Sequence, residues 1–211
     1  MSAPRLVLAS ASEARAALLR RAGFSFEVRP APEAVEARAL AAVRARGGPP
    51  EEQALAAARA KAEAVAALLA AEARRAVVLG ADTLVVSARG EVLGKGRDGR
   101  EAAEILATLA GTRHRVLTGA ALAEAPGGRR RELLAGSEVE MSPLSPAEIA
   151  AYVASGAAGG AAGAYRIQES GTDRHVRVVA GSFSNVVGLP VEEIIAVLAE
   201  FSILPAESRP G

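Results

Sequence analysis

An apolar stretch of eleven residues, Ala76 to Val86, constrains this chain more than any other part of its sequence. It reads Ala-Val-Val-Leu-Gly-Ala-Asp-Thr-Leu-Val-Val and carries one charged side chain, that of Asp82. A continuous apolar run followed by a turn at Arg89-Gly90 predicts a buried β-strand. A buried carboxylate costs on the order of several kcal/mol without partners. Asp82 is therefore a candidate for an ion pair, a metal site or acid–base chemistry; a structural carboxylate at a bulge or cap is the alternative.

The rest of the chain alternates strand and helix signals, which predicts a mixed α/β fold. Strands are predicted at 5–9, 24–28, 115–123, 131–141 and 176–179. Helices are predicted from 13 to about 23, over 33–75 with a break at 47–50, and at 99–109, 146–152 and 191–201. We expect a flexible loop at 156–163, one domain over residues 1–204 and a frayed tail at 205–211.

Composition excludes several classes of function. The 211 residues include no cysteine, which rules out disulfides, zinc–cysteine sites and thiol catalysis. The net charge is +1 and aromatic residues make up 3%, so binding to a nucleic acid polymer is not expected. Mean hydropathy is +0.20, but charged residues interrupt every long apolar run. With no signal-peptide pattern at its start, the chain is expected to be a soluble, cytoplasmic protein that does not bind membranes.

Hydroxyl groups and a guanidinium follow the first predicted strand. Ser10 and Ser12 lie where the next helix begins, and Arg15 follows one turn later. Backbone N–H groups and the helix dipole make such a junction an anion site. Ser10 and Glu13 have the spacing of a capping box. Ordinary helix capping with a solvated arginine is the alternative interpretation.

Lys61 and Lys95 stand out because the chain otherwise uses arginine for positive charge. Lys95 lies between two glycines, which lets the backbone approach a ligand and offers an ammonium to a phosphate; an ordinary turn is the alternative. A Walker A motif is absent. His114 and His175 lack metal-ligand spacing and are interpreted as structural or surface residues. Together these residues fit metal-assisted attack on a nucleotide phosphate better than acyl transfer.

Six sequence blocks follow one another in order over almost the whole chain. The first is Leu8-Ala9-Ser10-Ala11-Ser12 with Arg15 and Leu18-Leu19, and the fourth is Leu93-Gly94-Lys95 with Gly111, His114-Arg115-Val116 and Thr118-Gly119. The others are 60–62 (Ala-Lys-Ala), 80–83 (Gly-Ala-Asp-Thr), 162–168 (Ala-Gly-Ala-Tyr-Arg-Ile-Gln) and 181–190 (Gly-Ser-Phe-Ser-Asn-Val-Val-Gly-Leu-Pro). In these blocks the chain resembles the Maf-like nucleoside triphosphate pyrophosphatases.

The resemblance implies hydrolysis of a nucleoside triphosphate to the monophosphate and pyrophosphate with Mg²⁺ or Mn²⁺. Asp82 would accept the proton of the attacking water and contact the metal. Thr83 and Gln168 match the branch that acts on dTTP and UTP. The implied fold is a Maf/ITPase-like long twisted mixed sheet with flanking helices, in two lobes around a central cleft, often as a homodimer. The residues implied to hold the phosphates are Ser10, Ser12, Arg15, Lys61 and Lys95.

The chain departs from the family pattern at several positions. Ala14 replaces one of two arginines, Ala161 replaces a lysine, and Ala157-Ala158 replaces Glu-Pro. A family acid after the second strand has no clean counterpart; Glu33 and Glu36 are candidates, and Glu36 is favoured as a second metal ligand. Two alternatives stay open: a non-catalytic nucleotide-binding regulator linked to cell division, and a house-cleaning pyrophosphatase for ITP or XTP.

Overall fold

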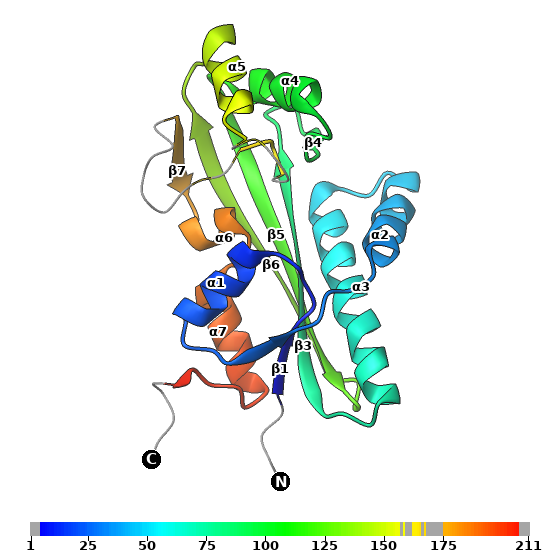
Figure 1. Cartoon of the computed structure of the whole chain (residues 1–211). Coiled ribbons are helices and arrows are strands. Elements are labelled where there is room, and N and C mark those ends of the chain that lie inside the picture. The colour runs from blue at the N-terminus through cyan, green and yellow to red at the C-terminus, as the bar shows by residue number, and fades with distance from the viewer. Residues whose placement is uncertain (1–4, 157, 159–161, 166, 168–174, 207–211) are drawn as a thin grey trace. The chain divides into compact units, whose positions relative to one another are not determined.

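The computed structural model describes residues 5–156, 158, 162–165, 167 and 175–206 (Figure 1). This part of the chain contains an open, mixed sheet of seven strands in the order β2-β1-β3-β5-β6-β7, with β4 paired to β3. β1 is parallel to β2 and β3, whereas β4 is antiparallel to β3 and β7 to β6. The strands are β1 (Arg5–Leu8), β2 (Phe26–Val28), β3 (Ala76–Val86), β4 (Val92–Leu93), β5 (Arg113–Ala125), β6 (Arg130–Met141) and β7 (Val176–Ala180).

Helices alternate with strands along much of the chain, although β4 follows β3 directly and β6 follows β5 directly; this confirms the predicted mixed α/β class. Pro50 opens the longest helix, where the missing N–H of proline costs no hydrogen bond. Among the described helices, none has the length and apolarity needed to span a bilayer. The helices are α1 (Glu13–Arg21), α2 (Glu33–Ala45), α3 (Pro50–Ala71), α4 (Gly99–Leu109), α5 (Pro146–Ala154), α6 (Phe183–Val187) and α7 (Val191–Glu200).

The chain forms two compact units, and the boundary between them falls within β3, β5 and β6. The first unit comprises Met1–Asp82, Thr118–Ala135 and Gly188–Gly211. The second comprises Thr83–Leu117 and Gly136–Val187. Each unit has its own buried cluster of apolar side chains.

In the first unit, small side chains let α3 lie close against the sheet (Figure 1). A Cβ atom at Gly80 would lie 2.3 Å from the Ala58 carbonyl oxygen, and one at Gly119 would lie 2.5 Å from the Ala54 carbonyl oxygen. Neither position has room for a side chain, so the two glycines allow α3 to approach the sheet this closely. The buried residues at this contact are Val7, Ala9, Ala58, Ala62, Val65, Ala66, Leu69, Ala76, Val78, Ala121, Ala123 and Ala125.

In the second unit, the cluster joins α4 and α5 to strand residues and to the segment around Tyr165. A buried hydrogen-bond network also fixes the five-residue helix α6. Asn185 Nδ2 donates to the Val116 carbonyl oxygen at 3.1 Å and to Ser137 Oγ at 2.9 Å. The cluster contains Val85, Ala102, Ile105, Leu106, Leu109, Val116, Val139, Met141, Ile149, Ala158, Ala164 and Tyr165.

Two local predictions from sequence are wrong. Ser10 and Glu13 do not form a capping box: the N-cap of α1 is Ser12, whose Oγ accepts from the Arg15 N–H. The strand expected from residue 24 begins at Phe26. No signal in the sequence indicated the helix α6, which is too short to show a helical period. Part of the predicted flexible loop, 157 and 159–161, lies outside the described residues, as do 207–211 of the tail.

Candidate active site

Asp82 has a positively charged partner in the first unit. Lys61 Nζ donates to Asp82 Oδ1 at 2.8 Å and to the Ala81 carbonyl oxygen at 3.2 Å. Asp82 is 7% exposed and Lys61 is 8% exposed, so both charges are largely removed from water. A buried carboxylate needs a charged or hydrogen-bonding partner to offset the loss of water, and Lys61 is that partner. Of the explanations considered for a buried Asp82, the structure shows the ion pair.

Close packing of α3 on β3 brings these two side chains together. Side chains alternate between the faces of a strand, so Val78, Gly80 and Asp82 share one face. At Gly80 the backbone of α3 lies against this face, and Lys61 is three residues beyond Ala58, which Gly80 contacts. The absence of a Cβ at Gly80 therefore places the Lys61 ammonium beside the Asp82 carboxylate.

Glu36 on α2 forms an ion pair with the same lysine. Lys61 Nζ lies 2.6 Å from Glu36 Oε2, and the Glu36 side chain is 33% exposed. One ammonium thus bridges an almost fully buried carboxylate and a half-buried one. Glu33, the other acid considered, is exposed in the first turn of α2. We call Glu36, Lys61 and Asp82 the carboxylate–lysine cluster.

The strand–helix junction after β1 lies beside β3. Leu8 is paired with Leu79, and the Ala9 N–H donates to the Leu79 carbonyl oxygen at 2.8 Å. Ser10 is buried, and its Oγ accepts from the Ser12 N–H at 3.2 Å. The parallel register therefore brings the predicted serine junction to the strand that carries Asp82.

Arg15 is oriented by two contacts within the first unit. Nη1 donates to Ser10 Oγ at 3.1 Å, and Nε donates to the Gly188 carbonyl oxygen at 2.8 Å. Burial lowers the pKa of Arg15 from its ordinary value, while the negative charges of Asp82 and Glu36 oppose that shift. The guanidinium thus lies in the electrostatic neighbourhood of the carboxylate–lysine cluster, with its orientation fixed.

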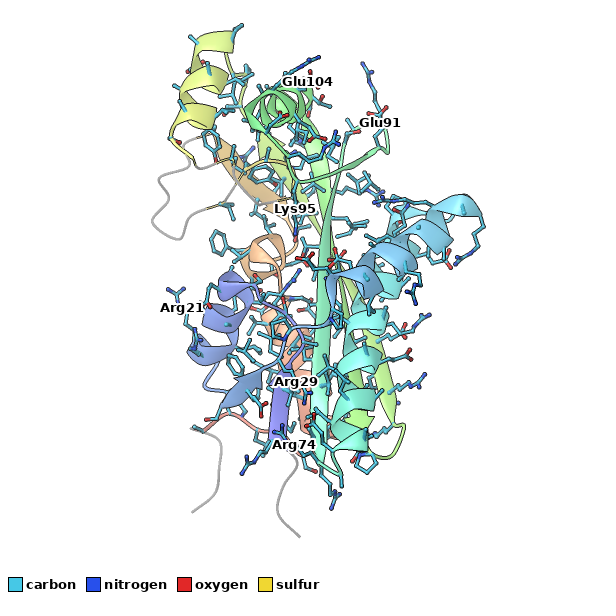
Figure 2. The ribbon with its side chains drawn as sticks, turned by 45° about the vertical axis from the view of Figure 1, so that its right-hand side comes forward. Arg21, Arg29, Arg74, Glu91, Lys95 and Glu104 are labelled. Atoms are coloured by element: carbon cyan, nitrogen blue, oxygen red, sulfur yellow. The ribbon has the colours of Figure 1, made fainter. Side chains whose placement is uncertain are left out.

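The other predicted site residues are not part of the carboxylate–lysine cluster. Thr83 begins the second unit, and strand alternation places its side chain on the face of β3 opposite to Asp82. Lys95 is exposed in the second unit, on the segment between β4 and α4 (Figure 2). Its backbone bridges to Ala162, and the Gly163 N–H donates to the Gly94 carbonyl oxygen at 3.0 Å. Gln168 and Ala161 lie outside the described residues.

Sequence reasoning missed residues that act through packing. Gly80 was part of a motif, but its contact with Ala58 depends on a helix more than twenty positions away. The signal available was a glycine inside an otherwise apolar strand, which indicates close approach of another backbone. The pairing of His114 with Tyr165 gave no signal, because the two residues are far apart in the chain.

The donor set fits a divalent cation that also contacts substrate. Glu36 and Asp82 supply two carboxylates within hydrogen-bond distance of one nitrogen. Mg²⁺ is commonly bound by one or two carboxylates, with waters and substrate phosphates as the remaining ligands. Within the described residues, no group of three or more histidine, aspartate or glutamate side chains could form a cage made of protein ligands alone. The chemistry of this pair therefore fits a phosphate-bound Mg²⁺ or Mn²⁺.

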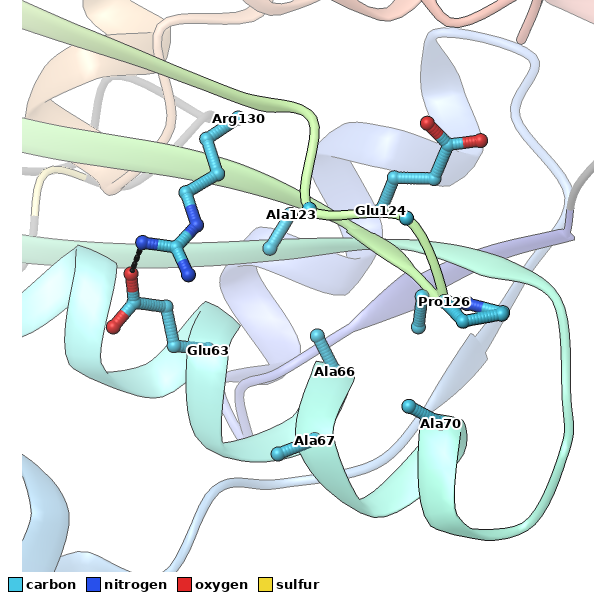
Figure 3. A pocket seen from close by; sticks show the side chains of 11 residues that line it. Glu63, Ala66, Ala67, Ala70, Ala123, Glu124, Pro126 and Arg130 are labelled. Atoms are coloured by element: carbon cyan, nitrogen blue, oxygen red, sulfur yellow. Dashed lines mark ion pairs between the residues drawn. The ribbon is translucent and has the colours of Figure 1, made fainter.

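A separate hollow of about 240 Å³ lies in the first unit, between α3 and the turn that joins β5 to β6 (Figure 3). Its walls include Ala66, Ala70 and Ala123, and an ion pair between Glu63 and Arg130 lies at its edge. It contains none of the predicted site residues. The candidate active site is therefore the carboxylate–lysine cluster with the neighbouring serine junction.

The fold and the site define an α/β protein with a buried carboxylate–lysine cluster beside a serine-containing strand–helix junction. The family model described as Maf-like protein matches residues 5–201. The chain therefore belongs to the Maf family, in agreement with the resemblance seen in its sequence blocks.

Relatives at substantial identity cover nearly the whole chain. A dTTP/UTP pyrophosphatase of Anaeromyxobacter dehalogenans is 45% identical over 198 residues, which is 93% of each chain. The protein of that name from Moorella thermoacetica is 43% identical over 94% of this chain and 96% of its own. The one from Salmonella typhimurium is 42% identical over 94% of both.

Proposed function

We propose that this protein hydrolyses dTTP and UTP to the nucleoside monophosphate and pyrophosphate. The observation that carries the proposal is the buried Asp82 carboxylate, held by Lys61 Nζ at 2.8 Å and close to Arg15 and the serine junction. The names of the relatives support the substrate class. An acid–base group beside cations is the arrangement that water attack on a phosphoanhydride requires.

Asp82 is the proton acceptor in this proposal. Its Oδ1 is engaged by Lys61, and none of the described residues donates a hydrogen bond to its Oδ2. Oδ2 takes a proton from water as the water oxygen bonds to the α-phosphorus. The bond between the α-phosphorus and the α,β-bridging oxygen breaks, and pyrophosphate leaves with the electron pair of that bond. Lys61 fixes the orientation of the carboxylate throughout.

The phosphate-binding roles follow from charge and position. Arg15, oriented by Ser10 and Gly188, supplies a guanidinium with donors suited to phosphate oxygens. Ser10 and Ser12 place hydroxyls and backbone N–H groups at the start of α1, where the helix dipole favours an anion. Lys95 supplies an exposed ammonium for a phosphate. Thr83 and Gln168 are proposed to select the pyrimidine base.

A divalent cation held by Asp82 and Glu36 would neutralise phosphate charge and polarise the phosphoryl oxygens. Glu36 is preferred to Glu33 for this role because it shares Lys61 with Asp82. Substituting Glu36 with glutamine is expected to raise the Mg²⁺ concentration at half-maximal activity. Formation of a homodimer stays a prediction from the resemblance, and a cytoplasmic location stays a prediction from the sequence.

Two other functions were considered from the sequence. A non-catalytic regulator would bind nucleotides without turnover, and a house-cleaning enzyme would act best on ITP or XTP. The names of the relatives favour neither. Ala14 and Ala161 stand where the family pattern has an arginine and a lysine. We therefore expect weaker nucleotide binding than in relatives that keep both cations.

The test is a panel of dTTP, UTP, ITP, XTP and the purine triphosphates, incubated with Mg²⁺ in ¹⁸O-labelled water. Pyrophosphate release should be fastest with dTTP and UTP, and the label should appear in the monophosphate because water attacks the α-phosphorus. Release only from ITP and XTP, or no release with any nucleotide, would overturn the proposal. Label in pyrophosphate would contradict the proposed site of attack.

A further inference from the structure

His114 and Tyr165 form a buried polar pair in the second unit that the proposed chemistry does not use. His114 Nε2 and the Tyr165 hydroxyl lie 2.8 Å apart, in one hydrogen bond. The rings meet edge to face, with centroids 5.4 Å apart. His114 is 2% exposed and Tyr165 is 5% exposed. Phenylalanine and leucine would fill such a space without the cost of burying polar atoms, so the hydrogen bond needs an explanation.

Tyr165 lies two residues after Gly163, in a segment whose backbone is joined to the segment carrying Lys95. The Gly163 N–H donates to the Gly94 carbonyl oxygen at 3.0 Å, and Ala162 is bridged to Lys95. These contacts lie within the second unit. The Tyr165 hydroxyl is therefore linked to Lys95 by a short path: along the chain to Gly163, and then across the backbone pairing.

The segment is held in a backbone conformation that needs support. Gly163 has φ +72° and Ala164 has φ +54°, and the second value is costly for a residue with a side chain. A Cβ atom at Gly163 would lie 2.9 Å from Val85 Cγ2 and 3.1 Å from the Tyr165 ring. Ala164 is fully buried. Tight packing and the Tyr165 hydrogen bond together fix this conformation.

The ammonium of Lys95 forms no ion pair or hydrogen bond within the described residues. Lys95 is exposed, lies between Gly94 and Gly96, and follows a strand of two residues, β4. Its neighbours are held on both sides, since Leu93 pairs with Val85 and a Cβ atom at Gly96 would lie 2.7 Å from Ala102 Cβ. The pairing with Ala162 and Gly163 is a backbone contact that Gly94 and Lys95 themselves make between these supports.

We propose that His114 and Tyr165 are positioning residues for Lys95, acting through the backbone pairing of Ala162 and Gly163 with Gly94 and Lys95. The proposal rests on the proposed function, in which Lys95 binds substrate phosphate. Neither ring touches the reacting atoms. Their hydrogen bond holds the segment 162–165, and that segment holds the loop that presents the ammonium.

The charge state of His114 agrees with this role. Burial lowers the pKa of His114 from 6.5 to about 4, so the ring is neutral at physiological pH. A neutral ring adds no positive charge for a phosphate. Its Nδ1 has no hydrogen-bond partner among the described residues, so the bond to Tyr165 is the polar contact that this structure gives the ring.

The decisive experiment removes the hydroxyl group alone. Tyr165→Phe should raise KM for dTTP roughly tenfold, the effect of one lost buried hydrogen bond, with a smaller change in kcat. The same variant should speed hydrogen exchange of the amides at residues 92–96 and 163. His114→Leu should reproduce both effects, and His114→Gln, which keeps a nitrogen near the position of Nε2, should restore most of both. Tyr152→Phe, the other tyrosine of the chain, is the matched control and should change neither.

A double-mutant cycle separates positioning from general loosening of the unit. If Tyr165 acts through Lys95, Tyr165→Phe should change KM by less than about twofold in a Lys95→Ala background. An equal effect of Tyr165→Phe on KM in both backgrounds would overturn the inference, as would unchanged exchange at residues 92–96.

The exchange measurement does not depend on turnover. If the unmodified protein releases pyrophosphate from no triphosphate, the proposed function fails, while faster exchange in Tyr165→Phe still supports the link between Tyr165 and the Lys95 loop. If the protein is active and exchange is unchanged, the positioning role fails alone.

Discussion

The two regions that carry the two lysines of the chain are built in opposite ways. Lys61 lies in the middle of a 22-residue helix, 8% exposed, and contacts two carboxylates. Lys95 is exposed on a short connection between glycines, and a backbone pairing with 162–163 supports it. The first lysine is fixed by packing of a helix on a strand. The second is fixed indirectly, so its position can be altered with little cost to the stability of the fold.

The largest effect that would test this comparison is expected at Lys61. Lys61→Met leaves the buried Asp82 carboxylate without its partner, and we expect a loss of about 4 kcal/mol in the free energy of unfolding. Adding Asp82→Asn to this variant should restore part of the loss, because the unpaired charge is removed. Urea unfolding followed by circular dichroism measures both. A loss below about 1 kcal/mol would contradict the idea that Lys61 holds a buried charge.

The second effect compares two glycines, one in each region. Gly80→Ala would place a Cβ atom 2.3 Å from the Ala58 carbonyl oxygen and 2.7 Å from the Ala62 nitrogen. Because both contacts are backbone atoms, α3 must shift, and we expect a loss of about 3 kcal/mol. Gly94→Ala is the control, since nothing lies within 4 Å of its Cβ position. Equal thermal stability of the two variants would show that the close approach of α3 is not required.

The third effect is a pH dependence that His114 introduces. Its pKa is about 4 in the folded protein and 6.5 in the unfolded chain, so between these values the unfolded state binds more protons. Stability is therefore complete above pH 6.5 and falls as the pH is lowered, by about 2 kcal/mol at pH 5. Glu27, Glu72, Glu101 and Glu148 have pKa values lowered below 4.5, so their contributions are lost at more acid pH.

The check is chemical unfolding of the unmodified protein and of His114→Gln at several pH values between 7 and 5. The His114→Gln curve should be nearly flat over this range, because the buried imidazole is removed. A decline of the same size in both proteins would assign the pH dependence to other groups.

The smallest effect is expected at Lys95. Lys95→Met should raise KM for dTTP about tenfold, as expected for one lost charged contact with phosphate, and leave the midpoint of thermal unfolding unchanged. Arg100→Met removes another exposed cation of the same unit, one that is paired with Glu104, and should leave KM unchanged. If Lys95→Met raises KM no more than Arg100→Met does, Lys95 does not contact substrate.

The sequence predicted the elements whose signals are local. The strand Ala76–Val86 and the helix Gly99–Leu109 have the predicted bounds, because an unbroken apolar run and a helix ended by Gly111 carry strong signals. The burial of Asp82 followed from the residues around it. The identity of its partner did not, since Lys61 is brought to it by the packing of α3 at Gly80.

Other features depended on geometry that spacing does not fix. Ser10 and Glu13 had capping-box spacing, but the cap is Ser12, because β1 ends at Leu8 and the helix starts only at Glu13. Ser145 and Glu148, which were not singled out, do form a capping box. Glu36 was preferred to Glu33 on resemblance, and its contact with Lys61 gives that preference a physical basis.

The measurement that tests the central claim most directly is the single-turnover rate of pyrophosphate release by Asp82→Asn, compared with Asp98→Asn. Asp98 is an exposed N-cap of α4, where asparagine serves equally well. We predict that Asp82→Asn still binds dTTP but loses roughly 1,000-fold in rate, the effect expected for a lost proton acceptor, while Asp98→Asn keeps the full rate. Release by Asp82→Asn at the rate of the unmodified protein would contradict the account.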